Sequence, residues 1–571
     1  MEFDVQTRGR RLSPVQLLRG QAALDAAREI LSGPTPVPAV AVDPQARQSG
    51  RITVLAIASP STAILVDPSG LDALGTMIAG CGKPLAAHEA KSIHRALLTT
   101  HGHAPSRWAC TRLSAQLLAA GREVDLMLTG IMARHHLPAP PSPEDGFEQM
   151  AQNACAIAVL VQRVIPALKK AGMAWISKIE AAAVAPVAEM EHHGMPFDAE
   201  AWRALAKNAE AERAELGAEL LKQFAPVRDS DLFGGAVLNL DSDAEVKAAL
   251  RALGHPVPDM RRSTIAQLPE PIGVLLARFR ELGKLTSTYG ESFLDYAGAD
   301  GRIHSTFEQI GASTGRMACH KPNLQAVVKD GPHRACFRCA DHRRLVIGDY
   351  ATCELRILAE MSGDPVFAEA FARGEDLHAR VASVMFDKPV SKTENVELRN
   401  RAKAVNFGLA YGMGVAGLAR AIDTDLRHAE QLLERYFQTF PKIRDFLEHS
   451  AREALERGYA CTLTGRRLDI EVGPDHTSRS AAERVAKNMP IQGTSADIIK
   501  LALARLRARL LSMRDAWIVN AVHDEIVVEC DGSQADEVCA IVAHEMEAAG
   551  AEILRTIPTA VDIGVGTVWD K

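Results

Sequence analysis

Two short acidic clusters are the residues of this chain best suited to chemistry. The first contains Asp349 and Glu354, and the second is His523-Asp524-Glu525, far downstream. Two carboxylates brought close together repel unless one is protonated or divalent cations neutralise them. A pair of Mg²⁺ ions about 3.5 to 4 Å apart could activate a hydroxyl nucleophile and stabilise a leaving pyrophosphate. The two clusters therefore predict two-metal transfer of a nucleotide onto a nucleic-acid end.

Apolar runs around both clusters predict the elements that position these carboxylates. Residues 345–348 form a short apolar run that predicts a buried strand ending at Asp349, and helical spacing follows it. Residues 517–519 and 526–528 are rich in β-formers, which predicts a hairpin with Asp524 near its tip. A single Asp at a strand end is more often a solvated turn or a helix cap, so neither cluster decides the function alone.

The segment between the clusters carries a stripe of cations and aromatic residues. Its members recur every four residues along a predicted helix: Arg399, Lys403, Phe407 and Tyr411. The two cations could grip a triphosphate, and the two rings offer flat surfaces to a sugar and a nascent base pair. An ordinary amphipathic helix with a basic end remains the alternative for the stripe alone.

Taken together, these motifs resemble those of family A DNA polymerases, the class that includes bacterial DNA polymerase I and several phage replicases. The family's three polymerase motifs occur in order at Asp349–Arg356, Arg399–Gly412 and Val522–Glu525. Further family segments surround them at 314–316, 322–325, 465–467 and 488–497. The resemblance covers roughly residues 179–571.

The resemblance implies a role for each residue of the reaction centre. The metal-binding carboxylates would be Asp349 and Asp524, and the catalytic set would be completed by Lys403 and Glu525. Glu354 would act as a steric gate that excludes a ribose 2′-hydroxyl. The other residues that would bind the incoming nucleotide are Arg399, His378, Phe407 and Tyr411.

The resemblance also implies the partners and the cofactor. The residues expected to touch DNA near the primer end are Arg316, Asn488, Gln492 and His523. Minor-groove acceptors are common to all base pairs, so such contacts check shape rather than sequence. The expected partners are primer-template DNA and deoxynucleoside triphosphates, with no membrane, and the chain is expected to act as a monomer. Two Mg²⁺ ions are the expected cofactor, and Mn²⁺ could replace them.

Three stretches depart from the family pattern. Ala351-Thr352-Cys353 replaces Ser-Gln-Ile in the first motif, and Met317-Ala318-Cys319 stands where hydroxyl residues follow Thr-Gly-Arg. Asn400 stands where a second Arg is common. Metal ligation should survive these changes, whereas a looser grip on primer-template DNA is our hypothesis.

The N-terminal region resembles a 3′-5′ exonuclease domain that has lost its metal ligands. Of four expected carboxylates only Asp43 remains, because Gln45, Ile93 and Ala154 stand at the other three positions, and Met150 stands where the family has Tyr. One carboxylate cannot hold two Mg²⁺ ions near a scissile phosphate. We therefore predict a structural vestige without proofreading activity.

The composition fits a large intracellular enzyme. The chain has 571 residues, 47% hydrophobic content and a net charge of −6, enough for several cores with cations concentrated locally where phosphates would lie. Ten cysteines without regular pairing and the lack of a signal peptide or long apolar span predict the cytoplasm of a bacterial cell or a phage-infected host.

The predicted fold class is a multidomain chain of α/β and α+β parts, a right-hand polymerase preceded by a ribonuclease-H-like exonuclease-type domain. The predicted ranges are 1–170 for the vestigial exonuclease-like domain and 171–571 for the polymerase domain, divided into thumb (171–300), palm (301–365 and 471–571) and fingers (366–470).

Two other functions stay open from the sequence. A single-subunit RNA polymerase has similar motifs, but Glu354 as a sugar gate and the intact His523-Asp524-Glu525 favour DNA. A non-catalytic DNA-binding scaffold descended from a polymerase is the second alternative. Phe407, where some relatives carry Tyr, also implies rejection of dideoxynucleotides.

Overall fold

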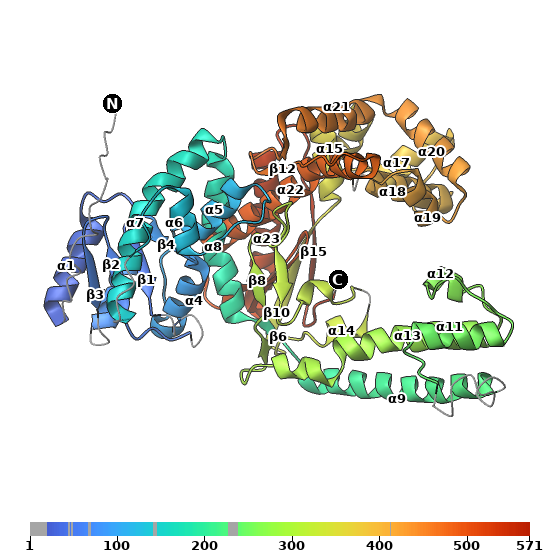
Figure 1. Cartoon of the computed structure of the whole chain (residues 1–571), viewed down its shortest axis with the longest axis horizontal. Helices are drawn as coiled ribbons and strands as arrows, with labels where there is room; N and C mark the ends of the chain where they lie inside the picture. Colours follow the sequence, from blue (N-terminus) through green and yellow to red (C-terminus); the bar gives the residue numbers. More distant parts are fainter. Residues whose placement is uncertain are drawn as a thin grey trace.

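The structure, a computed structural model, describes residues 20–43, 46, 50–66, 70–140, 146–225, 238–329, 331–410 and 413–570. An N-terminal α/β domain lies at one end of the long axis, a second sheet lies at the centre, and two helical regions project from the central sheet at the other end (Figure 1). Gln45 and Tyr411, both singled out in the sequence, fall outside the described residues.

The N-terminal domain is built on a five-stranded mixed sheet of order β3-β2-β1-β4-β5. The strands are β1 (Ala39–Val42), β2 (Leu55–Ala58), β3 (Ala63–Val66), β4 (Leu85–Ala87) and β5 (Trp108–Cys110). β2 runs antiparallel to both of its neighbours, whereas β1, β4 and β5 are parallel. The strands are short apolar runs buried on both faces, as expected for a sheet covered by helices on each side.

Helices cover both faces of this sheet. Alternate strand residues such as Val40 and Ile57 pack against α1 (Gly20–Ser32), α3 (Leu71–Ala79) and α4 (Ala90–His101). The intervening small residues, including Ala41 and Ala56, pack against α7 (Gly146–Lys170). α5 (Thr111–Ala119) and α6 (Leu128–Arg134) complete the domain. The predicted α/β unit is therefore present.

Within the described residues, α7 alone is long and apolar enough to cross a membrane by length and composition. The prediction that the chain has no long apolar span is therefore wrong for α7. In its most apolar window, 61% of the residues are buried inside the fold, and α7 packs along β1, β2 and β3. α7 is thus a core helix of the N-terminal domain in this structure.

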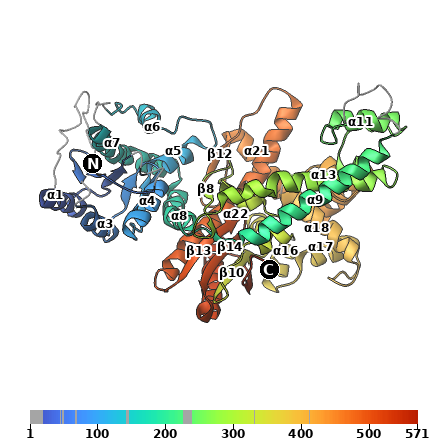
Figure 2. The same cartoon turned by 90° about the horizontal axis from the view of Figure 1, so that it is seen from below.

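α8 (Ala174–His193) lies between the N-terminal domain and the central sheet (Figure 2). It packs against α4 on one side and against β13 and the long helix α22 on the other. Although α8 falls inside the range predicted for the thumb, it lies apart from the projecting arm.

The arm consists of α9 (Ala199–Gln223), α11 (Asp243–Ala252), α12 (Arg262–Ile265) and α13 (Ile272–Tyr289). It has a small core of its own, which includes Leu220, Leu250 and Phe279. At the base of the arm, Trp202 stacks on Phe293 with ring centroids 4.1 Å apart. The arm therefore has an independent apolar core and an aromatic anchor at its base.

The central sheet has the order β13-β14-β10-β15 and is antiparallel throughout. Its strands are β10 (Arg343–Tyr350), β13 (Ala516–Val522), β14 (Glu525–Asp531) and β15 (Val561–Gly566). This confirms the strand predicted before Asp349 and the hairpin predicted around Asp524. α22 (His476–Leu510) and α23 (Ala535–Ile553) pack against it. Gly348 of β10 allows α23 to pack closely on the sheet, because a Cβ at this position would stand only 2.6 Å from the side chains of Val542 and Met546.

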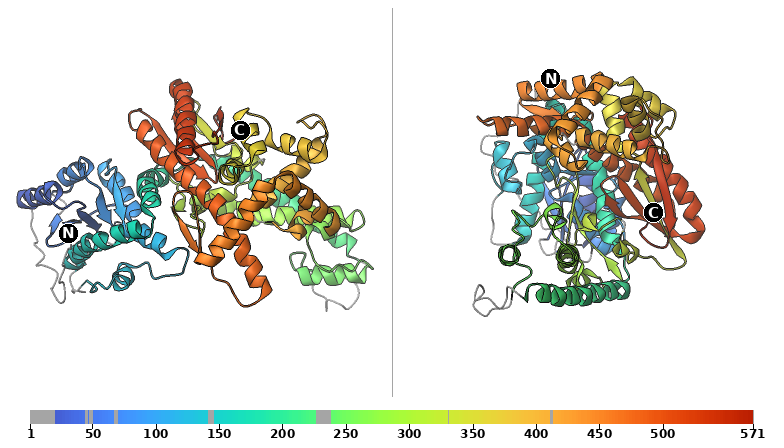
Figure 3. Two further views of the ribbon diagram at one scale, coloured as in Figure 1. Left: turned by 90° about the horizontal axis from the view of Figure 1, so that it is seen from above. Right: turned by 90° about the vertical axis from the view of Figure 1, so that its right-hand side faces the viewer.

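The second helical region runs from α15 to α21 and is seen from above in Figure 3. Its helices are α15 (Cys353–Ser362), α16 (Pro365–Ala372), α17 (Leu377–Phe386), α18 (Val396–Ala410), α19 (Val415–Ala421), α20 (Leu426–Thr439) and α21 (Pro441–Arg457). The hairpin of β11 (Tyr459–Cys461) and β12 (Arg467–Asp469) then leads to α22. α18 confirms the helix predicted for the cationic stripe over its described part.

Candidate active site

Strand pairing brings the two predicted metal-binding carboxylates together. Asp349 lies near the end of β10, directly opposite Glu525 at the start of β14. Asp524 occupies the turn before β14, and its carbonyl oxygen accepts a hydrogen bond of 3.1 Å from the backbone N–H of Tyr350. The two aspartates thus stand at the same end of neighbouring strands, as the sequence predicts.

The electrostatics of this pair fit a cation site. Burial, reinforced by the negative charge of Asp349, raises the pKa of Asp524 to about 6. The charge of Asp349 is partly neutralised by Lys329, whose Nζ lies 3.2 Å from Asp349 Oδ2. Among the described residues, no three His, Cys, Asp or Glu side chains gather as a preformed metal cage. Paired carboxylates completed by substrate phosphates and water are the usual arrangement for Mg²⁺, so these residues fit it.

Glu525 is held by its neighbours rather than exposed to solvent. Its Oε1 accepts a 2.6 Å hydrogen bond from the indole Nε1–H of Trp569, and Arg334 Nη1 lies 3.3 Å from both carboxylate oxygens. The guanidinium of Arg334 also lies 4.0 Å from the centroid of the Trp569 ring. These contacts balance the charge of a buried carboxylate and fix its position.

A cavity of about 280 Å³ opens in front of Asp524. It is lined by Arg316, Met317, Gln325, Thr352, Cys353, Glu354, Phe407, Ser495, Ala496, Ile499, His523 and Asp524. Arg316 Nη2 donates a hydrogen bond to Glu354 Oε1 across its wall. Predicted nucleotide-binding and DNA-binding residues therefore meet at one cavity beside the paired aspartates.

Two cavity residues adopt strained backbone conformations. Thr352 (φ 55°) and His523 (φ 55°) lie in the left-handed region, which a β-branched residue such as Thr rarely enters. Thr352 precedes α15, and its hydroxyl donates a 2.7 Å hydrogen bond to the carbonyl of Ala351. Strain of this kind costs about 1–3 kcal/mol and is typical of functional sites.

Cys353, one of the departures from the family pattern, is a buried free thiol in the cavity wall. Burial raises its pKa to about 12, so it is protonated at neutral pH. Ser495 Oγ lies 3.6 Å from its sulfur. Cys353 therefore acts as a small apolar wall residue rather than as a nucleophile.

The predicted phosphate-binding residues lie on α17 and α18. Arg399 pairs with Asp376, with its Nη2 2.7 Å from Oδ2, while Lys403 is exposed. The ring of His378 is buried beside Asn406 Nδ2, 3.1 Å away, and burial lowers its pKa to about 4. His378 is thus a neutral imidazole at physiological pH.

α22 presents the remaining predicted DNA contacts. Asn488 and Gln492 are half-buried and stand one helical turn apart. Ser495, Ala496 and Ile499, which line the cavity, continue the same helical face. Asn488 and Gln492 therefore lie along the helical face that leads into the cavity.

Sequence reasoning missed several residues of the site: Lys329, Arg334, Asp376, Ser495 and Trp569. These contacts join residues that are far apart in the sequence, and Lys329, Arg334 and Trp569 belong to no periodic pattern. Three positions did carry a signal: Lys329 shortly follows the family segment at 322–325, Ser495 lies within the segment at 488–497, and Asp376 stands two residues before His378.

In the N-terminal domain, Asp43 is the one carboxylate that remains from the exonuclease pattern, and its side chain accepts hydrogen bonds from nearby residues. Asp43 accepts hydrogen bonds from the N–H groups of Ala46 (2.8 Å) and Thr53 (3.0 Å) and from the Thr53 hydroxyl (3.2 Å). Ile93, Met150 and Ala154 are buried in the apolar cores on the two faces of the sheet.

Comparison with known proteins gives a consistent set of relatives. The sequence profile described as DNA polymerase family A matches residues 228–571. The chain is 33% identical over 444 residues to the thermostable DNA polymerase I of Thermus filiformis, covering 74% of this chain and 51% of that protein. It is 35% identical over 416 residues to that of Thermus aquaticus, covering 69% and 48%. The chain therefore spans about half the length of these curated relatives.

One solved structure is similar over nearly the whole chain. It is described as the POL domain of Pol1 from M. smegmatis in complex with DNA primer-template and dNTP. The TM-score is 0.81 at 28% identity, covering 98% of this chain and 99% of that one. The likeness thus includes the N-terminal domain as well as the central sheet and both helical regions.

Proposed function

Because the chain belongs to DNA polymerase family A, we propose that it is a template-directed DNA polymerase that extends a primer 3′ end by two-metal nucleotidyl transfer. The family predicted from the motifs is confirmed, and the right-hand fold class is confirmed by the solved relative. The observation that carries the proposed activity is the convergence of Asp349 and Asp524 beside the cavity that holds Glu354 and Arg316.

In this proposal Asp349 and Asp524 hold two Mg²⁺ ions, with Mn²⁺ as a substitute. When bound, such ions activate the primer hydroxyl and stabilise the leaving pyrophosphate. Lys329 lies against Asp349, so a cation bound to that carboxylate would compete with the Lys329 ammonium group for it. Glu525, fixed by Trp569 and Arg334, keeps the turn that carries Asp524 in place.

The helices above the cavity bind the nucleotide. Lys403 is exposed and free to meet phosphates, and it would protonate the leaving pyrophosphate. Arg399 would exchange part of its pairing with Asp376 for phosphate oxygens, and neutral His378 would donate one hydrogen bond. Phe407 lines the cavity and, with Tyr411, would pack on the sugar and the nascent base pair.

The ion pair between Arg316 and Glu354 joins a residue proposed to contact DNA with the residue proposed to select the sugar. Glu354 is buried and bonded to Arg316, so a ribose 2′-hydroxyl would crowd a carboxylate that cannot move freely. Arg316, His523, Asn488 and Gln492 would contact the primer-template near its growing end. The proposed partners are therefore primer-template DNA and dNTPs, handled by a single chain.

We further propose that the chain lacks 3′-5′ proofreading. Asp43 is occupied by backbone N–H groups, and apolar side chains fill the neighbouring ligand positions. Purified protein given a mismatched primer and Mg²⁺ should leave the primer uncut. Metal-dependent removal of the mismatched end would contradict this proposal.

Primer extension tests the proposed activity directly. Asp349→Ala and Asp524→Ala should abolish synthesis from dNTPs while leaving duplex binding nearly unchanged. Asp531→Ala, at the far end of β14, is the matched control and should retain synthesis. Parallel reactions with rNTPs separate a DNA polymerase from an RNA polymerase, and full activity of either active-site variant would refute the proposal.

A further inference from the structure

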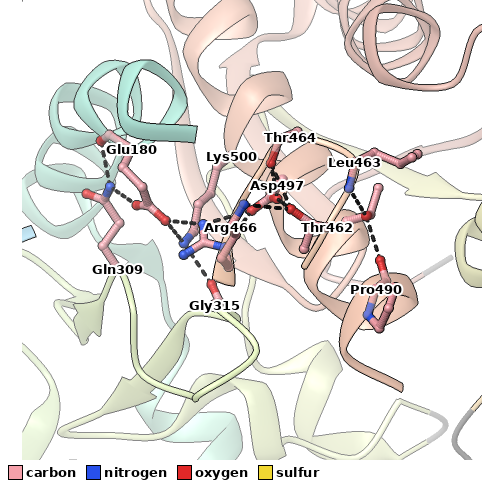
Figure 4. Close-up of polar contacts among 11 residues, drawn as sticks. Glu180, Gln309, Gly315, Thr462, Leu463, Thr464, Arg466, Pro490, Asp497 and Lys500 are labelled. Atoms are coloured by element: carbon pink, nitrogen blue, oxygen red, sulfur yellow. Dashed lines mark hydrogen bonds and ion pairs between the residues drawn. The ribbon is translucent and has the colours of Figure 1, made fainter. Parts of the chain in front are cut away.

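A buried cluster of ion pairs joins α8, α22 and the β11–β12 loop (Figure 4). Glu180 of α8 bonds to Lys500 Nζ of α22 at 2.5 Å and pairs with Arg466 of the β11–β12 loop. Arg466 Nε in turn donates to Asp497 Oδ1 at 2.8 Å. Three segments that are distant in the sequence therefore meet through four charged side chains.

The cluster is neutral overall and almost completely dry. The side-chain exposures are 1% for Glu180, 3% for Arg466, 0% for Asp497 and 0% for Lys500. Burial lowers the pKa of Lys500 to about 8. For Glu180 burial acts in the opposite direction and would raise the pKa, but the charges of Lys500 and Arg466 outweigh it and the pKa is lowered. Removing one partner from such a cluster leaves an uncompensated buried charge, which is strongly destabilising.

The cluster is also bonded to a loop of the candidate active site. Lys500 Nζ donates a 2.7 Å hydrogen bond to the carbonyl of Gly315. Gly315 has a φ of +90°, and a Cβ there would stand 2.4 Å from Arg466 Nε. A Cβ on Gly493 of α22 would stand 3.0 Å from the carbonyl oxygen of Thr314. The backbone of this loop is thus clamped between the cluster and α22.

The next residue in the loop is Arg316, which pairs with Glu354 at the cavity. A displacement of Gly315 would move the backbone from which the Arg316 side chain reaches that carboxylate. α8 is itself fastened to the N-terminal domain, because Lys91 and Arg95 of α4 both pair with Glu191 of α8. The position of α8 is therefore linked through Glu180 to the loop that carries Arg316.

We propose that Glu180, Arg466, Asp497 and Lys500 are positioning residues for nucleotide and primer discrimination, because they hold Gly315 where Arg316 can pair with Glu354. This inference rests on the proposed polymerase function. It also assigns a use to the N-terminal side of the molecule, since α8 supplies one carboxylate of the cluster.

Glu180→Gln tests this inference, with Glu189→Gln as the matched control. Glu189 lies on the same helix and also bridges to α22, with its Oε1 2.6 Å from Arg507 Nη2, but it does not touch the Gly315 loop. The readouts are two ratios of kcat/KM: dNTP over rNTP, and matched over mismatched primer end. A loss of folded protein lowers both members of a ratio equally, so each ratio is insensitive to a purely structural defect.

We expect Glu180→Gln to lower at least one ratio by about 10-fold or more, because a misplacement near 1 Å can cost about 100-fold in rate. Glu189→Gln should leave both ratios unchanged. If Glu180→Gln fails to fold, the double variant Glu180→Gln/Lys500→Met replaces it. The double variant removes one negative and one positive charge together, so no unpaired charge is left, and it also removes the Lys500 ammonium group that donates to the Gly315 carbonyl.

Unchanged ratios in a folded cluster variant would overturn the inference, as would an equal change in Glu189→Gln. An unmodified chain that does not extend primers would instead refute the proposed function. The two failures are therefore distinguishable.

Discussion

The hydrogen bond between Trp569 and Glu525 yields a sharp prediction, because the chain contains its own control. Trp569→Phe removes the indole N–H that donates to buried Glu525 at 2.6 Å but keeps an aromatic ring under Arg334. Trp517 also lies beneath an arginine, with Arg343 4.4 Å from its ring centroid. Its buried Nε1 has no acceptor among the described residues. Trp517→Phe therefore removes an indole N–H without removing a hydrogen bond.

The expected magnitude follows from the charge on the acceptor. A hydrogen bond to a charged group contributes about 1.5–3 kcal/mol, and Glu525 is 3% exposed, so water cannot replace the lost donor. Loss of the bond should speed amide exchange in β14 about 10- to 150-fold, if the amides exchange through an opening that breaks this contact. Trp517→Phe should change the same rates less than about 2-fold.

Native-state hydrogen exchange followed by mass spectrometry is the appropriate assay, because a chain of several domains does not unfold in one transition. Peptides covering 525–531 and 561–570 report on the contact, and peptides from the N-terminal sheet serve as an internal reference. Equal exchange in the two tryptophan variants would refute the reasoning, since the hydrogen bond would then contribute nothing measurable.

Three further predictions concern the cavity and its surroundings. The pKa of His378 is lowered to about 4, so its contribution to stability is full above pH 6.5 and is lost as the pH falls toward 4. His378→Gln should therefore make the fall of the melting temperature between pH 6.5 and 4 shallower by an amount corresponding to at most about 3 kcal/mol, while buried histidines such as His193 still contribute to the remaining fall. Thr352→Asn should stabilise the protein by about 1 kcal/mol, because Asn tolerates the left-handed region better than Thr, and an unchanged melting temperature would contradict strain at φ 55°. Cys353, with a pKa raised to about 12, should resist iodoacetamide at pH 8 in the folded protein while half-buried Cys461 reacts, and mass spectrometry of the labelled peptides checks both.

The sequence was sufficient for the elements that carry the paired carboxylates. The apolar run before Asp349 and the β-rich runs around Asp524 specify strands locally, and both strands are present. The cationic stripe likewise specifies α18 through its own spacing. Patterns with a short period are encoded within a single segment, so they can be read without knowledge of the tertiary fold.

The partners of those residues could not be predicted in the same way. Nothing near Glu525 in the sequence indicates Trp569, and an isolated lysine such as Lys329 has no periodicity that would point to Asp349. The placement of α8 against α22 depends on buried pairs such as Glu180 with Lys500, which form only after distant segments meet. Likewise, Arg399 was expected to face phosphates, and its pairing with Asp376 emerges only from the packing of α17 on α18.

The central claim is that Asp349 and Asp524 together hold the cations under an incoming nucleotide. Counting bound Mn²⁺ by electron paramagnetic resonance, in the complex with a 3′-deoxy-terminated primer-template and the next dNTP, tests it most directly. We expect two ions in the unmodified chain and at most one in Asp349→Ala or Asp524→Ala, with Asp531→Ala unchanged. Two ions retained in either active-site variant would contradict the account.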